Sequence, residues 1–202
     1  MKHPSTRAVF DYWNEKRGNR PAPERSDIDP GAIRHSLGDT FMLAADFVDQ
    51  LRFRLSGTRV CALFCRELKG EEFQALWNET SRGQIENLLT VVNEETIGAV
   101  AGVTGYAEDG ASVDLEFLLL PLAHIGHARV RALGVLTPLV APYWLGEKPL
   151  ATLELGTLRH IGAGIEPTTA PDLPRAVETV RLRHGFVVYS GGLEEPSDKR
   201  TG

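Results

Sequence analysis

The feature that most limits the fold is a predicted strand that runs directly into a short helix, within residues 51–77. Three apolar residues alternate with polar ones at its start, as in a half-buried strand: Leu51, Phe53 and Leu55. Gly57 ends the alternation, because glycine turns the chain freely. Three more apolar residues then follow at helical spacing: Val60, Leu63 and Phe64. This stretch therefore predicts a strand, a glycine turn and a short helix in succession.

The same two periods recur along the rest of the chain. An apolar stripe predicts a long helix over Thr80–Glu95, and Gly110 marks a turn between two strands of a β-hairpin. Phe117–Leu122 is nearly all apolar, as expected of a strand buried on both faces. The other predicted strands are Thr40–Ala45, Gly98–Tyr106, Ala132–Leu139 and Leu150–Arg159.

A helix is also predicted near the N-terminus, where Val9, Tyr12 and Trp13 recur at helical spacing. Together with Phe10, it carries three large aromatic residues on a short amphipathic body. The favoured interpretation is that these rings pack on their own domain. The alternative is a dimer contact, because aromatic side chains are enriched in the cores of interfaces.

Four short motifs carry a resemblance to a known family: D-Y-W-N-E-K-R-G at 11–18, D-I-D-P at 27–30, F-R-L-S-G-T-R-V-C at 53–61 and E-L-K-G at 67–70. Together they resemble a stand-alone bacterial PAS-like domain family of unknown function, over roughly residues 5–160. The asparagine that usually follows the second strand of a PAS domain is absent, and Gly57-Thr58 stand in its place. The resemblance implies an α+β fold, a five-stranded antiparallel sheet with helices on one face, plus an N-terminal helix.

The resemblance and the composition together predict four segments. Residues 1–39 are expected to form an N-terminal helical extension, and residues 40–160 the PAS-like domain. Residues 161–192 are predicted to be a linker and a C-terminal strand within Arg181–Ser190, and residues 193–202 a disordered tail.

Charge and composition narrow the class of function. The net charge is -5, which argues against nucleic-acid binding, since that role usually needs a basic face. No apolar run approaches the roughly 20 residues that a membrane helix requires, so no membrane role is expected. Two cysteines supply no disulfide framework, and we therefore expect a cytoplasmic protein.

Two groups of side chains are candidate metal, haem or redox ligands. Cys61 and Cys65 lie four residues apart on a predicted helix and share a face, but no second pair stands at metal-binding spacing. His124, His127 and His160 are candidates for haem or metal ligation, without a third ligand at a recognisable spacing. We expect structural or solvated roles for both groups, and so no metal site; the cofactor, if any, is left unknown.

A basic cluster lies on the polar face of the predicted second strand and just beyond it: Arg52, Arg54 and Arg59. Guanidinium groups bind phosphate or carboxylate, so a nucleotide or an acidic metabolite is one interpretation. The favoured one is a solvated strand face whose arginines pair with acidic residues such as Glu116.

The resemblance and the absence of any catalytic motif lead to one main hypothesis. The chain is expected to be a non-enzymatic sensory or signalling module that binds a signalling partner protein and forms a homodimer. It would bind a small-molecule ligand of unknown identity between helices and sheet. The residues predicted to line this pocket are Phe53, Leu55, Leu63, Phe64, Trp77, Leu88, Phe117 and Leu119.

Two alternatives stay open at this point. The first is a small enzyme of unknown reaction that uses the same pocket, with Glu116 and His124 as an acid–base pair. The second is an adaptor protein with a filled core and no ligand. A ligand retained by the purified protein would separate the sensor from the adaptor.

Overall fold

The computed structural model describes residues 1–45, 51–123, 131–162, 182–183 and 186–187. The chain divides into two compact units, Met1–Pro167 and Thr168–Gly202. In the described part of the second unit, β7 (Leu182–Arg183) pairs with β8 (Phe186–Val187), where the sequence predicted one longer strand. The predicted tail at 193–202 lies outside the described residues. The boundaries predicted at residues 39, 160 and 192 stay predictions.

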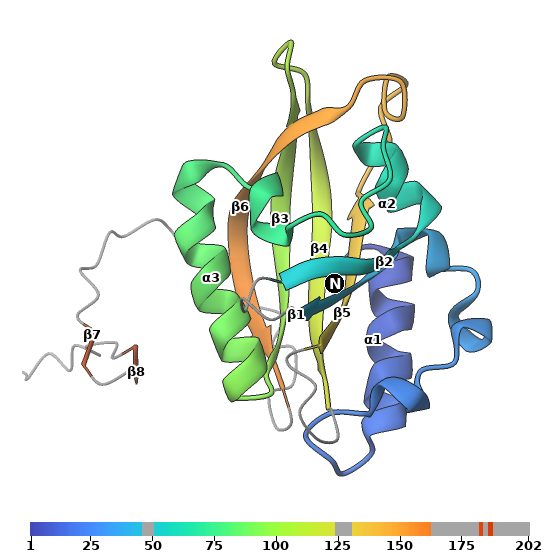
Figure 1. The fold of residues 1–202 in the computed structure, drawn as a ribbon, viewed down its shortest axis with the longest axis vertical. Coiled ribbons are helices and arrows are strands. Elements are labelled where there is room, and N and C mark those ends of the chain that lie inside the picture. Colours follow the sequence, from blue (N-terminus) through green and yellow to red (C-terminus); the bar gives the residue numbers. More distant parts are fainter. Residues whose placement is uncertain (46–50, 124–130, 163–181, 184–185, 188–202) are drawn as a thin grey trace, which may run out of the picture. The chain divides into compact units, whose positions relative to one another are not determined.

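The first unit is built on one antiparallel sheet, with strand order β2-β1-β5-β4-β3-β6 (Figure 1). It has six strands, one more than the family resemblance implied. The edge strand β6, which corresponds to the predicted strand at Leu150–Arg159, pairs along the outer edge of β3 from Gly98↔Ile161 to Ala107↔Leu150. The strands are β1 (Thr40–Ala45), β2 (Leu51–Ser56), β3 (Gly98–Ala107), β4 (Ser112–Leu122), β5 (Arg131–Pro138) and β6 (Leu150–Ile161).

Helices precede the sheet and connect its strands. The α-helix α3 begins after Asn78, whose side chain accepts a 2.9 Å hydrogen bond from the Ser81 N–H and caps the first turn. The α-helices are α1 (Pro4–Arg17), α2 (Thr58–Leu63) and α3 (Glu79–Glu94). The short 3-10 helices are η1 (Arg25–Asp27), η2 (Pro30–Ile33), η3 (Leu37–Asp39) and η4 (Phe73–Leu76).

Strand β4 explains why the sheet has a core on each face. Its successive side chains alternate between two clusters, because neighbouring residues of a strand point to opposite faces. Leu115, Phe117 and Leu119 join the core that contains α2, η4 and α3. Leu118, Leu120 and Leu122 join the core that contains α1. Burial of Phe117–Leu122 on both faces is therefore confirmed, and Figure 1 shows α3 beside β6 and α1 beside β5.

The N-terminal helix α1 is firmly part of this unit. Val9, Tyr12 and Trp13 are buried in its core, and the Trp13 Nε1 donates a 2.8 Å hydrogen bond to the Pro121 carbonyl oxygen. The interpretation that these aromatic rings pack on their own domain is confirmed. The two buried rings are consequently not exposed for a dimer contact.

A β-bulge in β2 overturns one predicted pocket residue. Phe53 pairs with Leu43, but Leu55 pairs with Met42, so Arg54 is an extra residue on this strand. An extra residue moves the side chains beyond it to the other face of the sheet. Phe53 is buried beside α2 and η4, whereas Leu55 is 53% exposed, and its placement in an internal pocket with Phe53 was wrong.

Two glycines are required by close approach. A Cβ on Gly134 of β5 would collide with the ring of Phe41, which lies across this strand. A Cβ on Gly57 would collide with the carbonyl oxygens of Leu37 and Gly38. Gly57 therefore lets η3 and the start of α2 lie against each other, and Gly134 makes room for an aromatic core.

Candidate functional site

Five aromatic rings fill the space between the sheet and its α2–η4–α3 side. Neighbouring rings lie 5.5 to 6.2 Å apart, centroid to centroid, within the range of favourable aromatic pairs. Phe117 stacks on Phe41 with an interplanar angle of 11°, and Trp77 meets Phe117 edge-on at 76°. The members of this aromatic core are Phe41, Phe53, Phe73, Trp77 and Phe117.

The structure brings seven of the eight predicted pocket residues into the cluster around this aromatic core. All seven are buried: Phe53, Leu63, Phe64, Trp77, Leu88, Phe117 and Leu119. They pack against one another and against the rings, and Leu55 alone lies elsewhere. That any of the seven contacts a ligand stays a prediction.

Two polar atoms of η4 and its end are buried without a hydrogen-bond partner among the described residues. They are the Gln74 Oε1 and the Trp77 Nε1. A buried donor or acceptor left unpaired costs about 1–3 kcal/mol. Such atoms in a native structure call for a partner, which a water or a bound molecule supplies.

Gln74 also lines a cleft of about 270 Å³ between η4, α3 and the facing ends of β1 and β2. We name it the α3 cleft. Leu51 and Leu89 contribute apolar walls and belong to the same cluster as the aromatic core. The full lining is Ala45, Leu51, Gln74, Glu86, Leu89, Thr90 and Asn93. The cleft thus combines an apolar wall with a few polar groups, as small-molecule sites do.

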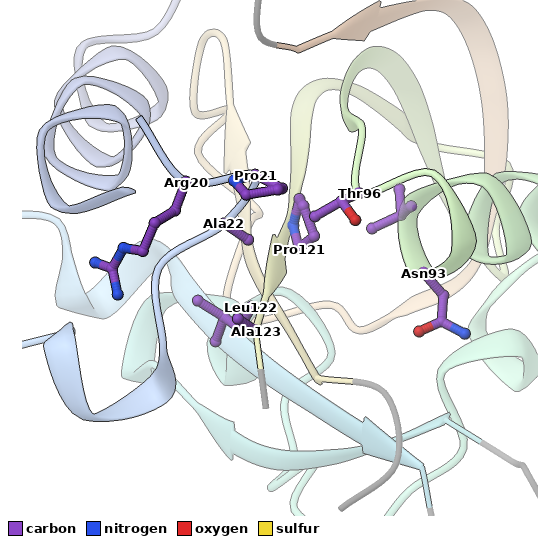
Figure 2. Close-up of a pocket in the computed structure, with 9 residues that line it drawn as sticks. Arg20, Pro21, Ala22, Asn93, Thr96, Pro121, Leu122 and Ala123 are labelled. Atoms are coloured by element: carbon purple, nitrogen blue, oxygen red, sulfur yellow. The ribbon is translucent and has the colours of Figure 1, made fainter. Parts of the chain in front are cut away.

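A second cavity, of about 370 Å³, opens beyond the end of α3 (Figure 2). Asn93 lines both this cavity and the α3 cleft, so the two adjoin the same turn of helix. The side chain of Arg20 points away from Asn93 and Thr96 in Figure 2, and its guanidinium bonds to Asp27 at 2.7 Å. This cavity therefore offers mainly apolar surface, from the Pro21–Ala22 and Pro121–Ala123 segments.

Asp39, just before β1, links helices that cover opposite faces of the sheet. Its carboxylate accepts two hydrogen bonds from Arg59 of α2, at 2.6 and 2.8 Å, and one of 2.6 Å from the Ser5 hydroxyl of α1. Burial raises the pKa of the Asp39 carboxyl, but the bonds from Arg59 and Ser5 outweigh burial and hold the pKa below its usual value.

Glu116 of β4 fixes the start of α1. It is 5% exposed, and its two carboxylate oxygens accept hydrogen bonds from the Lys2 and His3 N–H groups, at 2.6 and 2.8 Å. A carboxylate that receives main-chain N–H groups makes strong, charge-assisted bonds. We call Asp39, Glu116 and their partners the α1 clasp. Sequence reasoning missed it, because its partners lie 113 and 114 residues from Glu116 along the chain.

The predicted pairing of the basic cluster with Glu116 was wrong. Glu116 is bound by the N-terminal main chain rather than by arginines. Arg59 pairs with Asp39, and Arg52 donates a 3.0 Å hydrogen bond to the Gly70 carbonyl oxygen. The cluster therefore does not converge on one anion site. The alternative of a small enzyme paired Glu116 with His124 as acid and base. The Glu116 carboxylate is bound by the Lys2 and His3 N–H groups, and His124 lies outside the described residues.

Of the remaining candidate ligands, the structure describes Cys61, Cys65 and His160. Cys61 and Cys65 are free thiols, and the Cys61 Sγ lies 3.7 Å from a Glu67 carboxylate oxygen. His160 is exposed on β6, and His127 is outside the described residues. Within the described part of the chain, no group of three His, Cys, Asp or Glu side chains is placed to hold a metal ion. No described helix is long and apolar enough to cross a membrane.

Comparison with known proteins identifies the family. A family model described as a PAS domain matches residues 1–137, a span that contains α1 and nearly all of β1 to β5. The chain belongs to the PAS domain family, whose members are in general sensory modules. Strand β6 lies beyond the matched residues. No curated protein matches the sequence.

Solved structures with a similar fold are distant in sequence. A light-oxygen-voltage domain studied with a flavin analogue is 12% identical, with a TM-score of 0.43, over 58% of this chain and 87% of that one. The dark-state Aureochrome1 LOV structure is 13% identical, with a TM-score of 0.42, over 58% and 85%. A PAS domain from Colwellia psychrerythraea is 14% identical, with a TM-score of 0.39, over 55% and 97%.

Proposed function

We propose that this PAS domain is a non-enzymatic sensory or signalling module that binds a small molecule in the α3 cleft. One observation carries the proposal: Gln74 lines the α3 cleft, and its buried Oε1 has no hydrogen-bond partner among the described residues. A ligand that donates a hydrogen bond to this oxygen would remove the cost of leaving it unpaired. An apolar part of the same ligand would lie against Leu51 and Leu89.

Binding in the α3 cleft would reach the other face of the sheet through shared elements. Leu89 belongs to the same cluster as Phe117 of β4. Leu118, the next residue of β4, belongs to the core on the other face of the sheet. Asp39 ties α2 directly to α1. A ligand that favours one of two arrangements of these contacts shifts the population toward it, and α1 would carry the change to a partner protein.

The partner is proposed to be another protein, with the module itself a cytoplasmic homodimer. The composition supports this setting, through a net charge of -5 and two cysteines that remain free thiols. The proposed sensor role also rests on the PAS family, whose members are in general sensory modules.

Native mass spectrometry of the gently purified full chain tests the ligand. We expect a retained small molecule, and its loss in Gln74→Leu, which keeps a similar volume but removes the acceptor. Gln84→Leu is the matched control, because Gln84 is exposed on α3 and does not line the cleft. Equal retention by both variants would contradict a site at Gln74. The same spectrum reports whether the chain is a dimer.

An adaptor without a ligand is the second candidate, and the aromatic core favours it. Five contacting rings already occupy the space between the sheet and η4. Repeated preparations that show only the bare chain mass, with partner proteins still bound, would support this reading against the sensor.

A further inference from the structure

A third cavity, of about 180 Å³, lies under the loop that carries η1 and η2. It is on the α1 side of the sheet, since its apolar lining comes largely from the core that contains α1, including Ile28, Ile33, Met42 and Leu133. Leu55, which the bulge in β2 turns away from the aromatic core, lines it as well. We name it the η-loop pocket. It shares no lining residue with the α3 cleft.

The only charged side chain among the described residues that line this pocket is Arg25. Arg25 is half-buried, and the one hydrogen bond of its side chain in the described structure runs from a terminal nitrogen to the Ile28 carbonyl oxygen, at 3.3 Å. It forms no ion pair with any described carboxylate. A guanidinium has five N–H donors, so most of those on Arg25 are left for another acceptor.

The acidic residues of the same loop are engaged elsewhere. Asp27 accepts hydrogen bonds from Arg20, at 2.7 Å, and from the Glu24 N–H, at 2.9 Å. Asp29 accepts one from the Gly31 N–H, at 2.8 Å. The loop thus carries an arginine beside an apolar cavity while its own carboxylates are turned to other donors. An external carboxylate suits this arginine, because the two make bidentate, charge-assisted pairs.

The other polar side chains of the lining are turned elsewhere. The Thr40 hydroxyl donates a 2.9 Å hydrogen bond to the Leu37 carbonyl oxygen. Ser56 pairs with Phe41, whose ring lies in the aromatic core, so the Ser56 side chain points to the face opposite Leu55 and Met42. Arg25 is therefore the group that favours an anion, at the polar end of a site whose remaining walls are mainly apolar.

Hydrogen bonds and the sheet hold the two walls of the pocket. The Tyr12 hydroxyl of α1 donates to the Asp27 carbonyl oxygen, at 3.2 Å, and accepts from the Asp29 N–H, at 2.8 Å, which holds the loop on the helix. The opposite wall is the β1–β5 part of the sheet. A site fixed in this way loses little freedom on binding, which favours affinity for a small ligand.

We propose that the η-loop pocket binds a short aliphatic monocarboxylate, with its carboxylate on Arg25 and its hydrocarbon chain against Ile33, Met42 and Leu133. The volume sets the size of the chain. At about 30 Å³ for each water, 180 Å³ equals roughly six water molecules, which corresponds to an acid of about four to six carbons. The site is independent of the proposed α3-cleft function.

Methyl-detected NMR titration of the full chain with sodium hexanoate tests the proposal. We expect saturable shifts at the Ile33 and Leu133 methyl groups. Hexan-1-ol has the same hydrocarbon chain without the charge, and we expect it to bind about tenfold more weakly or worse, as losing charge-assisted bonds predicts. Arg25→Gln should weaken hexanoate by a similar factor of about ten.

Arg34→Gln is the matched control, since Arg34 is exposed beside η2 and does not line the pocket. It should leave hexanoate binding unchanged, and both variants should keep the dispersed spectrum of the folded chain. Absence of saturable shifts, equal binding of hexanol and hexanoate, or equal weakening by the two arginine variants would overturn the proposal. So would shifts that map to Leu89 in place of Ile33, since they would assign hexanoate to the α3 cleft and leave that function standing.

Discussion

The two faces of the sheet are covered by different kinds of contact. On the α3 face, five aromatic rings pack against one another and against aliphatic side chains of α2 and α3. On the α1 face, a smaller apolar core is joined by two buried carboxylates, Asp39 and Glu116, which hold the first residues of α1. The same strand, β4, supplies side chains to both faces, so the difference comes from what covers the sheet.

Because of this difference, we expect the stability of the two faces to respond differently to pH and to substitutions. Packing of apolar rings does not depend on pH, whereas the bonds from Arg59 and Ser5 to Asp39 in the α1 clasp are strongest while Asp39 is ionised. Protonation of Asp39, or substitution of Asp39 or Glu116, should therefore act on α1 and leave the aromatic core in place.

The largest effect is expected from Phe117→Ala, which removes a ring that contacts Phe41, Phe73 and Trp77. We expect the free energy of unfolding to fall by about 4 kcal/mol, as for large-to-small changes in well-packed cores. Urea unfolding measures it, with near-UV circular dichroism as a report on the rings. Leu118→Ala, its neighbour on the other face, should cost less and leave the near-UV spectrum largely intact. A loss below about 1 kcal/mol for Phe117→Ala would show that the rings are not tightly packed.

Glu116→Gln should have the next largest effect. One oxygen that accepts an N–H becomes an NH₂ group, which cannot, and the charge is lost, so we expect about 2 kcal/mol of destabilisation. Asp114→Asn is the matched control on the same strand, because Asp114 is exposed. Its unfolding free energy should be unchanged. Equal unfolding free energies of the two variants in urea would show that the Glu116 carboxylate does not hold α1.

Asp39→Asn gives a smaller loss with a defined pH dependence. The pKa of Asp39 is lower in the folded chain than the unfolded value of about 3.9. Its contribution is therefore fully present above that unfolded pKa and disappears as the pH falls through the folded pKa. We expect the variant to be about 1–2 kcal/mol less stable at pH 7, with the gap closing below about pH 4. A gap that stays constant down to pH 2 would contradict the assignment.

Leu55→Ala is expected to have the smallest effect, and it tests the bulge in β2. Leu55 is 53% exposed, so its loss should change the free energy of unfolding by less than about 1 kcal/mol. Phe53→Ala, two residues earlier and buried, should cost about 3 kcal/mol or more. Similar costs for the two variants in urea unfolding would mean that both side chains face the aromatic core.

Local patterns in the sequence predict most of the elements, and they fail where two distant segments meet. The apolar stripe of α3 and the turn at Gly110 gave a helix and a hairpin that the structure confirms. The bulge at Arg54 leaves no trace in the alternation of its strand, because Leu55 continues the pattern after it. The bulge turns Leu55 to the other face of the sheet, and this change is visible only in the register between β2 and β1.

The candidate sites were harder to predict for the same reason. Glu116 reads as an exposed strand residue, because its partners at the N-terminus are far away in the sequence. Gln74 offered a weak signal, as a polar residue between the buried Phe73 and Leu76, but nothing local says that its amide oxygen is left unpaired. Arg25 lies in a stretch that reads only as a polar loop.

Hydrogen exchange of the native full chain tests most directly whether the two faces are held independently. Amides of α1 from Ala8 to Arg17 would be compared with those of Leu88 to Val92 in α3, in the wild type and in Glu116→Gln. The account predicts that the variant speeds exchange in α1 through local opening, while the α3 amides change only by the global loss of stability. Equal acceleration in α1 and α3 would mean that both helices open only when the whole domain unfolds, and would contradict a separately held α1.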